Sequence, residues 1–257
     1  MTGVVADIAA RISRESELAN ALAVVRGRLA AAARAAGRNA DEIALLPVTK
    51  FFPATDVAIL FALGCSSFGE AREQEASAKV ADVARWAGTG ARPIHWHMVG
   101  QIQRNKARSL ARWAHTVHSV ASVRVVNALD RAVGAALQEG ERTGRLRVYL
   151  QLSLDGDVSR GGVDISLPGA VDELCAQVAA SRNLELLGLM SIPPLTWEAE
   201  AAFARLQAEH ARVLQAHPGA VGLSAGMSGD LEVAIKHGST CVRVGTALMG
   251  SRPLRSP

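Results

Sequence analysis

The 257-residue chain has few cysteines and aromatic residues, and it lacks any long apolar run. Its three cysteines, Cys65, Cys175 and Cys241, form no C-x-x-C motif, which excludes a disulfide framework and a zinc ribbon and favours a reducing compartment. It has neither a basic-then-apolar leader nor an apolar run of about 18 residues. We therefore expect a cytoplasmic protein that makes no membrane contact.

The chain has little excess charge, with a formal net charge of +4. Its densest basic run is Arg104, Lys106, Arg108 and Arg112, whose spacing spreads the charges around a helix instead of aligning them in one stripe. Aromatic residues make up only 4% of the chain and form no ladder on which bases could stack. We expect no nucleic-acid partner, and small anionic ligands suit this charge better.

The chain alternates short apolar runs with longer amphipathic segments and contains no low-complexity linker. Strands are expected at residues 43–49, 65–68, 94–99, 116–120, 147–153, 185–191, 221–224 and 241–244. Helices are expected at residues 55–63, 70–85, 104–113, 122–142, 168–181, 197–217 and 229–237, after an alanine-rich helix at residues 6–36. This order predicts a single α/β domain over residues 1–257, a (β/α)8 TIM barrel with an extra N-terminal helix. A doubly wound sheet agrees less well with the sequence, because the glycine-rich dinucleotide-binding turn of that fold is missing after the first strand.

The first strand of this barrel ends in a lysine, Lys50. Active sites of such barrels lie at the carboxyl ends of the strands. Apolar neighbours such as Val48, Phe51 and Phe52 would lower the pKa of the Lys50 amine and make it a nucleophile. From the residues alone, a strand-end lysine that extends into solvent is an equally good interpretation.

The loops after the last two strands contain glycines and hydroxyl groups, as phosphate sites of this fold do. One loop runs from Ser224 through Gly226, Met227 and Ser228 into a short helix, and the other has Gly245 and Thr246. Glycines permit close backbone approach, and a helix N-terminus presents N–H groups to an anion. A plain helix cap and a plain turn are the alternatives for each loop taken singly.

An amine and a phosphate cradle in one barrel predict a phosphorylated aldehyde held as a Schiff base, and pyridoxal 5′-phosphate fits this description. Arg243 would then face the pyridine nitrogen, where a cation disfavours ring protonation and weakens the ring as an electron sink. An ion pair at the barrel end is the alternative for Arg243.

The rival hypothesis is a metal-dependent barrel hydrolase. His95 and His97 share one face of a strand, as a pair of metal ligands would. His115 and His118, however, are three residues apart and cannot share a strand face. Because no carboxylate ends the final strand, we expect no metal and interpret His97 as a hydrogen-bonding residue.

Six segments of the chain resemble the pyridoxal-phosphate homeostasis protein family. They occur in order from about residue 41 to Arg252 and comprise Val48-Thr49-Lys50, Phe68-Gly69-Glu70, His97-Met98-Val99-Gly100 with Gln103-Arg104-Asn105-Lys106, Gly188-Leu189-Met190, Gly226-Met227-Ser228-Gly229-Asp230 and Arg243-Val244-Gly245-Thr246. The resemblance implies a single barrel like the N-terminal domain of alanine racemase. It also implies a cytosolic protein that buffers or delivers pyridoxal phosphate and influences amino-acid and keto-acid pools, with enzymes that use the cofactor as candidate partners.

The resemblance further implies the roles of individual residues. Lys50 carries the cofactor and Arg243 approaches its ring nitrogen. The phosphate is held around Ser224, Gly226, Met227, Ser228, Gly245 and Thr246, and Met190 belongs to the same cofactor site. The chain departs from the family at Ala71, where an asparagine near the cofactor is common, and at Arg160, where lysine is common.

A carrier is favoured over a racemase-like enzyme. Racemases of this fold type place a tyrosine from an added β-domain on the open face of the cofactor. This chain ends at Pro257, so we expect no such domain, and its single tyrosine, Tyr149, falls inside the fifth expected strand. We therefore expect a monomeric cofactor-binding protein without a defined reaction, with a racemase-like enzyme as the alternative.

Overall fold

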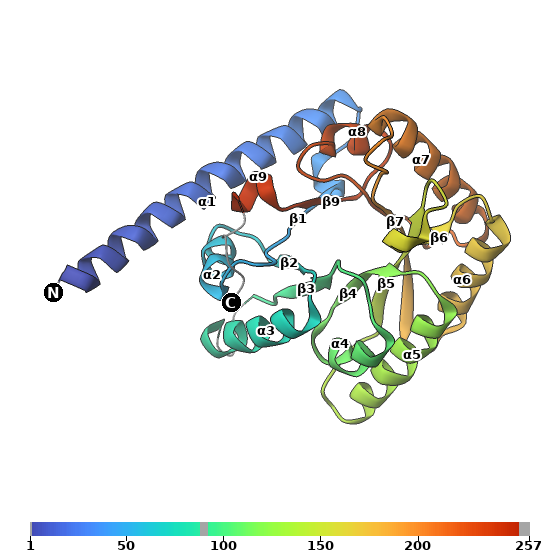
Figure 1. The fold of residues 1–257 in the computed structure, drawn as a ribbon, viewed down its shortest axis with the longest axis horizontal. Coiled ribbons are helices and arrows are strands. Elements are labelled where there is room, and N and C mark those ends of the chain that lie inside the picture. The colour runs from blue at the N-terminus through green and yellow to red at the C-terminus, as the bar shows by residue number, and fades with distance from the viewer. Residues whose placement is uncertain (1, 88–91, 252–257) are drawn as a thin grey trace.

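The centre of the molecule is a sheet of parallel strands (Figure 1), and the computed structural model describes residues 2–87 and 92–251. The nine strands are β1 Ala44–Pro47, β2 Ser67–Glu70, β3 His95–Met98, β4 Thr116–Val120, β5 Leu146–Ser153, β6 Val163–Asp164, β7 Leu184–Ser191, β8 Gly222–Ser224 and β9 Cys241–Val244. All eight expected strands are present, and their ends differ from the prediction by at most two residues. The two-residue β6 was not predicted.

The strands close into a barrel. They follow one another in the order β1-β9-β8-β7-β5-β4-β3-β2, and β6 pairs with β5 outside this path. The two ends of the order, β1 and β2, meet at a parallel bridge between Val48 and Gly69, where the Thr49 N–H donates to the Gly69 carbonyl at 2.9 Å. The predicted eight-stranded parallel barrel is therefore confirmed.

Helices surround the barrel on its outer side (Figure 1). The α-helices are α1 Thr2–Ala35, α2 Ala54–Ala62, α3 Glu73–Ala87, α4 Ala107–Trp113, α5 Val123–Gln138, α6 Pro168–Ala180, α7 Ala199–Ala216, α8 Leu231–Lys236 and α9 Thr246–Met249. Three 3-10 helices, η1 Ala40–Glu42, η2 Arg104–Lys106 and η3 Val158–Arg160, lie in the connections. None of the described helices is both long enough and apolar enough to cross a bilayer.

The N-terminal helix α1 completes the outer layer beside the last strand. Because α9 has only four residues, it covers little of the barrel. Leu18, Leu22 and Val25 of α1 are buried in one apolar cluster with Leu231 of α8 and Leu248 of α9. Figure 1 shows α1 running past α9 and α8, with its first turns extending beyond the barrel.

The prediction was wrong where it started a helix at Glu70. This residue ends β2, is fully buried, and α3 begins three residues later. The expected helix 104–113 divides into η2 and α4. Basic side chains of that region pair with carboxylates, since Lys106 lies 3.3 Å from Glu73 and Arg112 lies 2.7 Å from Glu141.

Candidate functional site

A cavity of about 300 Å³ lies at the carboxyl ends of the strands. It collects most of the predicted site residues, because β1 and β9 are neighbours in register and the β8–α8 loop lies beside them. The residues lining the cavity are Val48, Lys50, Phe51, Phe52, Val99, Ile192, Met227, Ser228, Gly229, Arg243, Gly245, Thr246 and Gly250. Six of the nine predicted residues are in this set, and Met190, Ser224 and Gly226 are not.

Lys50 is carried by a tight turn directly after β1. The Phe52 N–H donates to the Thr49 carbonyl at 3.1 Å, which places Lys50 and Phe51 at the two central positions of the turn. Phe51 has a φ of 70°, the one positive value at a non-glycine residue in the described part of the chain. Such a conformation costs of order 1–3 kcal/mol, so surrounding contacts must hold the turn in place.

A buried ion pair supplies such contacts. Lys79 of α3 donates to the Thr49 carbonyl at 2.8 Å and to Glu70 Oε1 at 2.6 Å, and the Thr49 hydroxyl donates to the same Oε1 at 2.6 Å. Burial raises the pKa of Glu70, while the Lys79 charge and the two hydrogen bonds oppose that shift. We call Thr49, Glu70 and Lys79 the seam cluster, since they join β1 to β2 where the barrel closes and fix the turn that carries Lys50.

The loops after β8 and β9 lie side by side on the wall of the cavity. The Ala247 N–H in the first turn of α9 donates to the Ser228 hydroxyl at 3.1 Å. Within the first loop, the Met227 N–H donates to Asp230 Oδ1 at 2.5 Å. The two loops are thus joined by a hydrogen bond, with Ser228, Gly229, Gly245 and Thr246 on the cavity wall.

Gly226 has a packing role in this loop. Its φ is 89°, and a Cβ at this position would stand 2.6 Å from the Cβ of Ala234 in α8. A glycine is therefore required for the loop to approach the helix. Gly226 sets the shape of the loop while its neighbours line the cavity.

Arg243 enters the cavity from β9 and is only 5% exposed. It donates to Ser224 Oγ at 2.7 Å and to the Ser191 carbonyl at 3.0 Å. Ser224 is completely buried and is linked to the cavity wall by its bond with Arg243. Met190 of β7 is buried next to Ser224 in the strand register, also away from the cavity wall.

Sequence reasoning missed several residues of the cavity wall. Val99 and Ile192 directly follow β3 and β7, whereas Phe51 and Phe52 were expected only as apolar neighbours of Lys50. Since barrel sites form at the carboxyl ends of the strands, the position of these residues in the chain was the signal that could have found them. The burial of Glu70 had no comparable signal.

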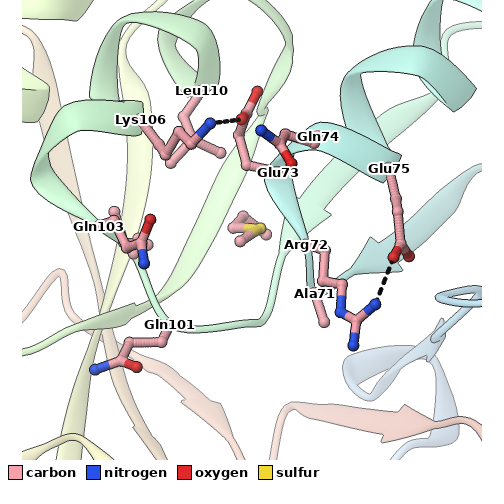
Figure 2. A pocket seen from close by; sticks show the side chains of 11 residues that line it. Ala71, Arg72, Glu73, Gln74, Glu75, Gln101, Gln103, Lys106 and Leu110 are labelled. Carbon is pink, nitrogen blue, oxygen red and sulfur yellow. Dashed lines mark hydrogen bonds and ion pairs between the residues drawn. The ribbon is translucent and has the colours of Figure 1, made fainter.

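Ala71 lies in a second cavity of about 380 Å³, whose lining shares no residue with the Lys50 cavity. Figure 2 shows it between the start of α3 and the β3–α4 connection, with the ion pairs Lys106–Glu73 at 3.3 Å and Arg72–Glu75 at 2.8 Å. Its cations are thus each paired with a carboxylate. The departure at Ala71 therefore falls outside the wall that contains Lys50 and Arg243.

The histidines give the metal hypothesis no support. Within residues 2–87 and 92–251, no three His, Cys, Asp or Glu side chains are grouped so that they could hold a metal ion. His97 Nδ1 and His118 Nε2 are 2.9 Å apart and are hydrogen-bonded to each other. His97 is thus the hydrogen-bonding residue that the sequence indicated.

Comparison with known proteins identifies the family of this barrel. The model of the family described as alanine racemase, N-terminal domain, matches residues 23–253. A pyridoxal phosphate homeostasis protein of Mycobacterium tuberculosis is 68% identical over 256 residues, which cover 98% of this chain and 99% of the relative. One from Escherichia coli is 34% identical, with 92% and 97% covered. The chain belongs to the pyridoxal phosphate homeostasis protein family, as its six motifs indicated.

Solved structures agree on the fold. PipY of Synechococcus elongatus, solved with pyridoxal phosphate (PLP) bound, superposes with a TM-score of 0.74 at 31% identity, covering 91% of this chain and 100% of PipY. An alanine racemase of Clostridium difficile has a TM-score of 0.65 at 13% identity, and this chain spans 57% of its length. At that identity, the racemase shows a common barrel and no more.

Proposed function

We propose that this protein binds pyridoxal 5′-phosphate in the Lys50 cavity and acts in its intracellular homeostasis. The observation that carries the proposal is the convergence of one amine, one buried guanidinium and two glycine-containing loops with hydroxyl groups on a single cavity of about 300 Å³. These groups suit a ligand with an aldehyde, a ring nitrogen and a phosphate. The names of the relatives and the PLP-bound PipY structure support this choice of ligand.

Lys50 is the proposed attachment point. When bound, the cofactor supplies an aldehyde with which the Lys50 amine condenses, releasing one water and forming a reversible Schiff base. The turn between Thr49 and Phe52 presents the amine from the end of β1, and the seam cluster keeps that turn from relaxing. Lys79 thus holds the backbone of the turn that carries Lys50, through the Thr49 carbonyl and Glu70.

The phosphate is proposed to lie between the loops after β8 and β9. Ser228 and Thr246 provide hydroxyl donors there, and Gly229 and Gly245 leave the backbone accessible. Arg28 of α1 holds the first loop from outside by donating to the Ser228 carbonyl at 3.0 Å. The phosphate cradle thus extends to the N-terminal helix.

Arg243 is proposed to face the ring nitrogen. A guanidinium has no acceptor atom and keeps its proton, so it can donate to an unprotonated pyridine nitrogen and disfavours the protonated form. An unprotonated ring is a weak electron sink, which suits storage of the cofactor better than chemistry on an amino acid.

Tyr149 does not provide the proton donor that a racemase needs. It is the single tyrosine of the chain, is 7% exposed, and lies tilted against His118 with ring centres 4.6 Å apart. Burial raises its pKa above the usual value. We therefore propose a carrier that exchanges the cofactor with solvent amines or with enzymes that require it.

Trapping PLP on its lysine by borohydride reduction tests the proposal. Protein mixed with PLP should show a visible absorption band, and borohydride reduction followed by peptide mass mapping should place the adduct on Lys50 among the four lysines of the chain. Lys50→Ala should lose the band and the adduct, and Lys236→Ala, at an exposed position, should retain both. Full covalent attachment in Lys50→Ala would overturn the site, and amino-acid racemisation at an enzyme-like rate would replace the carrier by an enzyme.

A further inference from the structure

Four side chains form a continuous hydrogen-bonded chain that starts at Arg243. Its Nη1 donates to Ser224 Oγ at 2.7 Å, Ser224 Oγ lies 2.9 Å from His118 Nδ1, and His118 Nε2 lies 2.9 Å from His97 Nδ1. The four residues come from β9, β8, β4 and β3. We call this chain the histidine relay, and only its first member lies on the wall of the Lys50 cavity.

Both imidazoles of the relay are neutral at pH 7. His118 and Ser224 are fully buried. Burial lowers the pKa of His97 to about 3, and burial, His97 and the charge of Arg243 lower the pKa of His118 well below its ordinary value. Each neutral ring has one N–H donor and one acceptor nitrogen, so the relay has a definite direction.

The charge of Arg243 selects that direction. Arg243 can only donate, so Ser224 Oγ is the acceptor in the first bond. If the Ser224 hydroxyl then donates to His118 Nδ1, His118 carries its proton on Nε2 and donates to His97. Every group in this order turns its electronegative atom toward the cation, which is the favourable alignment for a chain of dipoles. The reverse order points the His118 N–H back toward Arg243.

Arg243 has two anchors of different kinds. The Ser191 carbonyl belongs to the backbone of β7 and cannot turn away. The Ser224 hydroxyl can rotate, and when it donates to His118 Nδ1, 2.9 Å away, that acceptor sets its direction. The relay therefore constrains the Ser224 hydroxyl, whose oxygen is the second anchor of Arg243.

We propose that His118 and His97 are positioning residues that, through Ser224, aim the Arg243 guanidinium at the ring nitrogen of the bound cofactor. This inference rests on the proposed function, and it adds a determinant of ring protonation that lies outside the cavity wall. His118 accepts from Ser224 at Nδ1 and donates to His97 from Nε2. Loss of this acceptor frees Ser224 and Arg243 and lets the ring nitrogen take up a proton more easily.

The first test is the tautomer of His118 in the wild-type protein. Nitrogen-15 NMR of histidine-labelled protein distinguishes an Nε2–H from an Nδ1–H imidazole, and the chain has only seven histidines. The proposal requires Nε2–H on His118. An Nδ1–H form overturns the direction of the relay whether or not any variant folds.

The second test follows the absorption spectrum of the PLP-loaded protein against pH in His118→Leu and His118→Asn. In His118→Leu, the pH at which the cofactor band changes should rise by about one unit, and the dissociation constant of PLP should rise about tenfold, the effect of one lost charge-assisted hydrogen bond. His118→Asn places an amide oxygen near the former Nδ1, so it should keep the Ser224 bond and give a smaller shift.

His210→Asn is the matched control. His210 is also a buried histidine and bonds the Ala220 carbonyl at 2.8 Å, outside the relay. It should lose stability without moving the pH midpoint or the dissociation constant. If the wild-type protein takes up no cofactor on Lys50, the proposed function fails and this inference with it. If the wild-type protein takes up the cofactor on Lys50 but His118→Leu leaves the pH midpoint of the cofactor band unchanged, this inference alone is overturned.

Discussion

The seam cluster and the histidine relay are both clusters of hydrogen-bonded polar groups next to the same cavity, but they are built in opposite ways. The seam cluster joins two charges, Lys79 and Glu70, around a backbone carbonyl of the turn that carries Lys50. The relay has one charge, Arg243, continued by neutral side chains. An ion pair resists the separation of its two charges. In a chain of neutral hydrogen-bonded groups, the orientation of each group constrains the orientation of the next. We infer that the first holds the position of the amine and the second tunes the ring.

The largest expected effect comes from breaking the ion pair of the seam cluster. Lys79→Met leaves the buried Glu70 carboxylate without its cation, and its Oε2 already has no hydrogen-bond partner among the described residues. The free energy of unfolding should fall by about 3–5 kcal/mol. Urea denaturation of the variant and the wild type measures the loss.

Two further variants test whether the loss of stability in Lys79→Met is specific to the seam cluster. Lys236→Met removes a cation from an exposed pair with Glu200 and should have a small effect, because water screens that pair. The double variant Glu70→Leu with Lys79→Met removes both charges and should recover much of the stability. If Lys79→Met is as stable as Lys236→Met, the seam cluster does not hold the turn.

Acid titration distinguishes the two clusters, because His97 and Glu70 change the stability in opposite directions as the pH falls. An unfolded histidine has a pKa of about 6.5, whereas burial lowers the pKa of His97 to about 3 in the folded protein. The unfolded chain therefore binds protons first, and stability contributed by His97 is complete above about pH 6.5 and falls as the pH decreases toward 3, with a slope of up to about 1.4 kcal/mol per pH unit. Glu70 acts in the opposite sense, because its raised pKa favours the folded state as the pH falls.

The measurement is thermal denaturation between pH 4 and pH 7. His97→Gln should have a shallower loss of melting temperature with falling pH than the wild type, since one proton uptake is removed. His210→Asn also removes a histidine whose pKa burial lowers, and it should flatten the curve without altering the relay. A His97→Gln curve parallel to that of the wild type would show that His97 is not buried as a neutral base.

The smallest effect is expected at the exposed tether between α1 and the β8–α8 loop. Arg28 pairs with Glu232 at 2.7 Å and donates to the Ser228 carbonyl at 3.0 Å. Both side chains are partly exposed, so Arg28→Ala should cost less than about 1 kcal/mol of stability and weaken PLP binding only a few-fold. Urea denaturation and a PLP titration measure the two quantities. A loss as large as that of Lys79→Met would contradict the distinction between buried and exposed anchors.

The barrel was predictable from the sequence because its strands are short Val-, Ile- and Leu-rich runs separated by amphipathic helices. The place of Lys50 at a strand end and the two glycine-containing loops were predictable for the same reason, since each follows a strand. Glu70 was misplaced because a glutamate before a helical segment favours a helix start, and only the tertiary contacts with Thr49 and Lys79 bury it in a strand. The relay joins residues as far apart as 97 and 243, so periodicity along the chain does not reveal it.

The central claim is that the cofactor lies in the Lys50 cavity between the two clusters. A crystal structure of the protein grown with PLP tests it most directly. We expect a covalent bond to Lys50 Nζ, the phosphate between Ser228 and Thr246, and Arg243 at the ring nitrogen with its Ser224 bond retained. A cofactor bound in the cavity beside Ala71, or attached to another lysine, would contradict it.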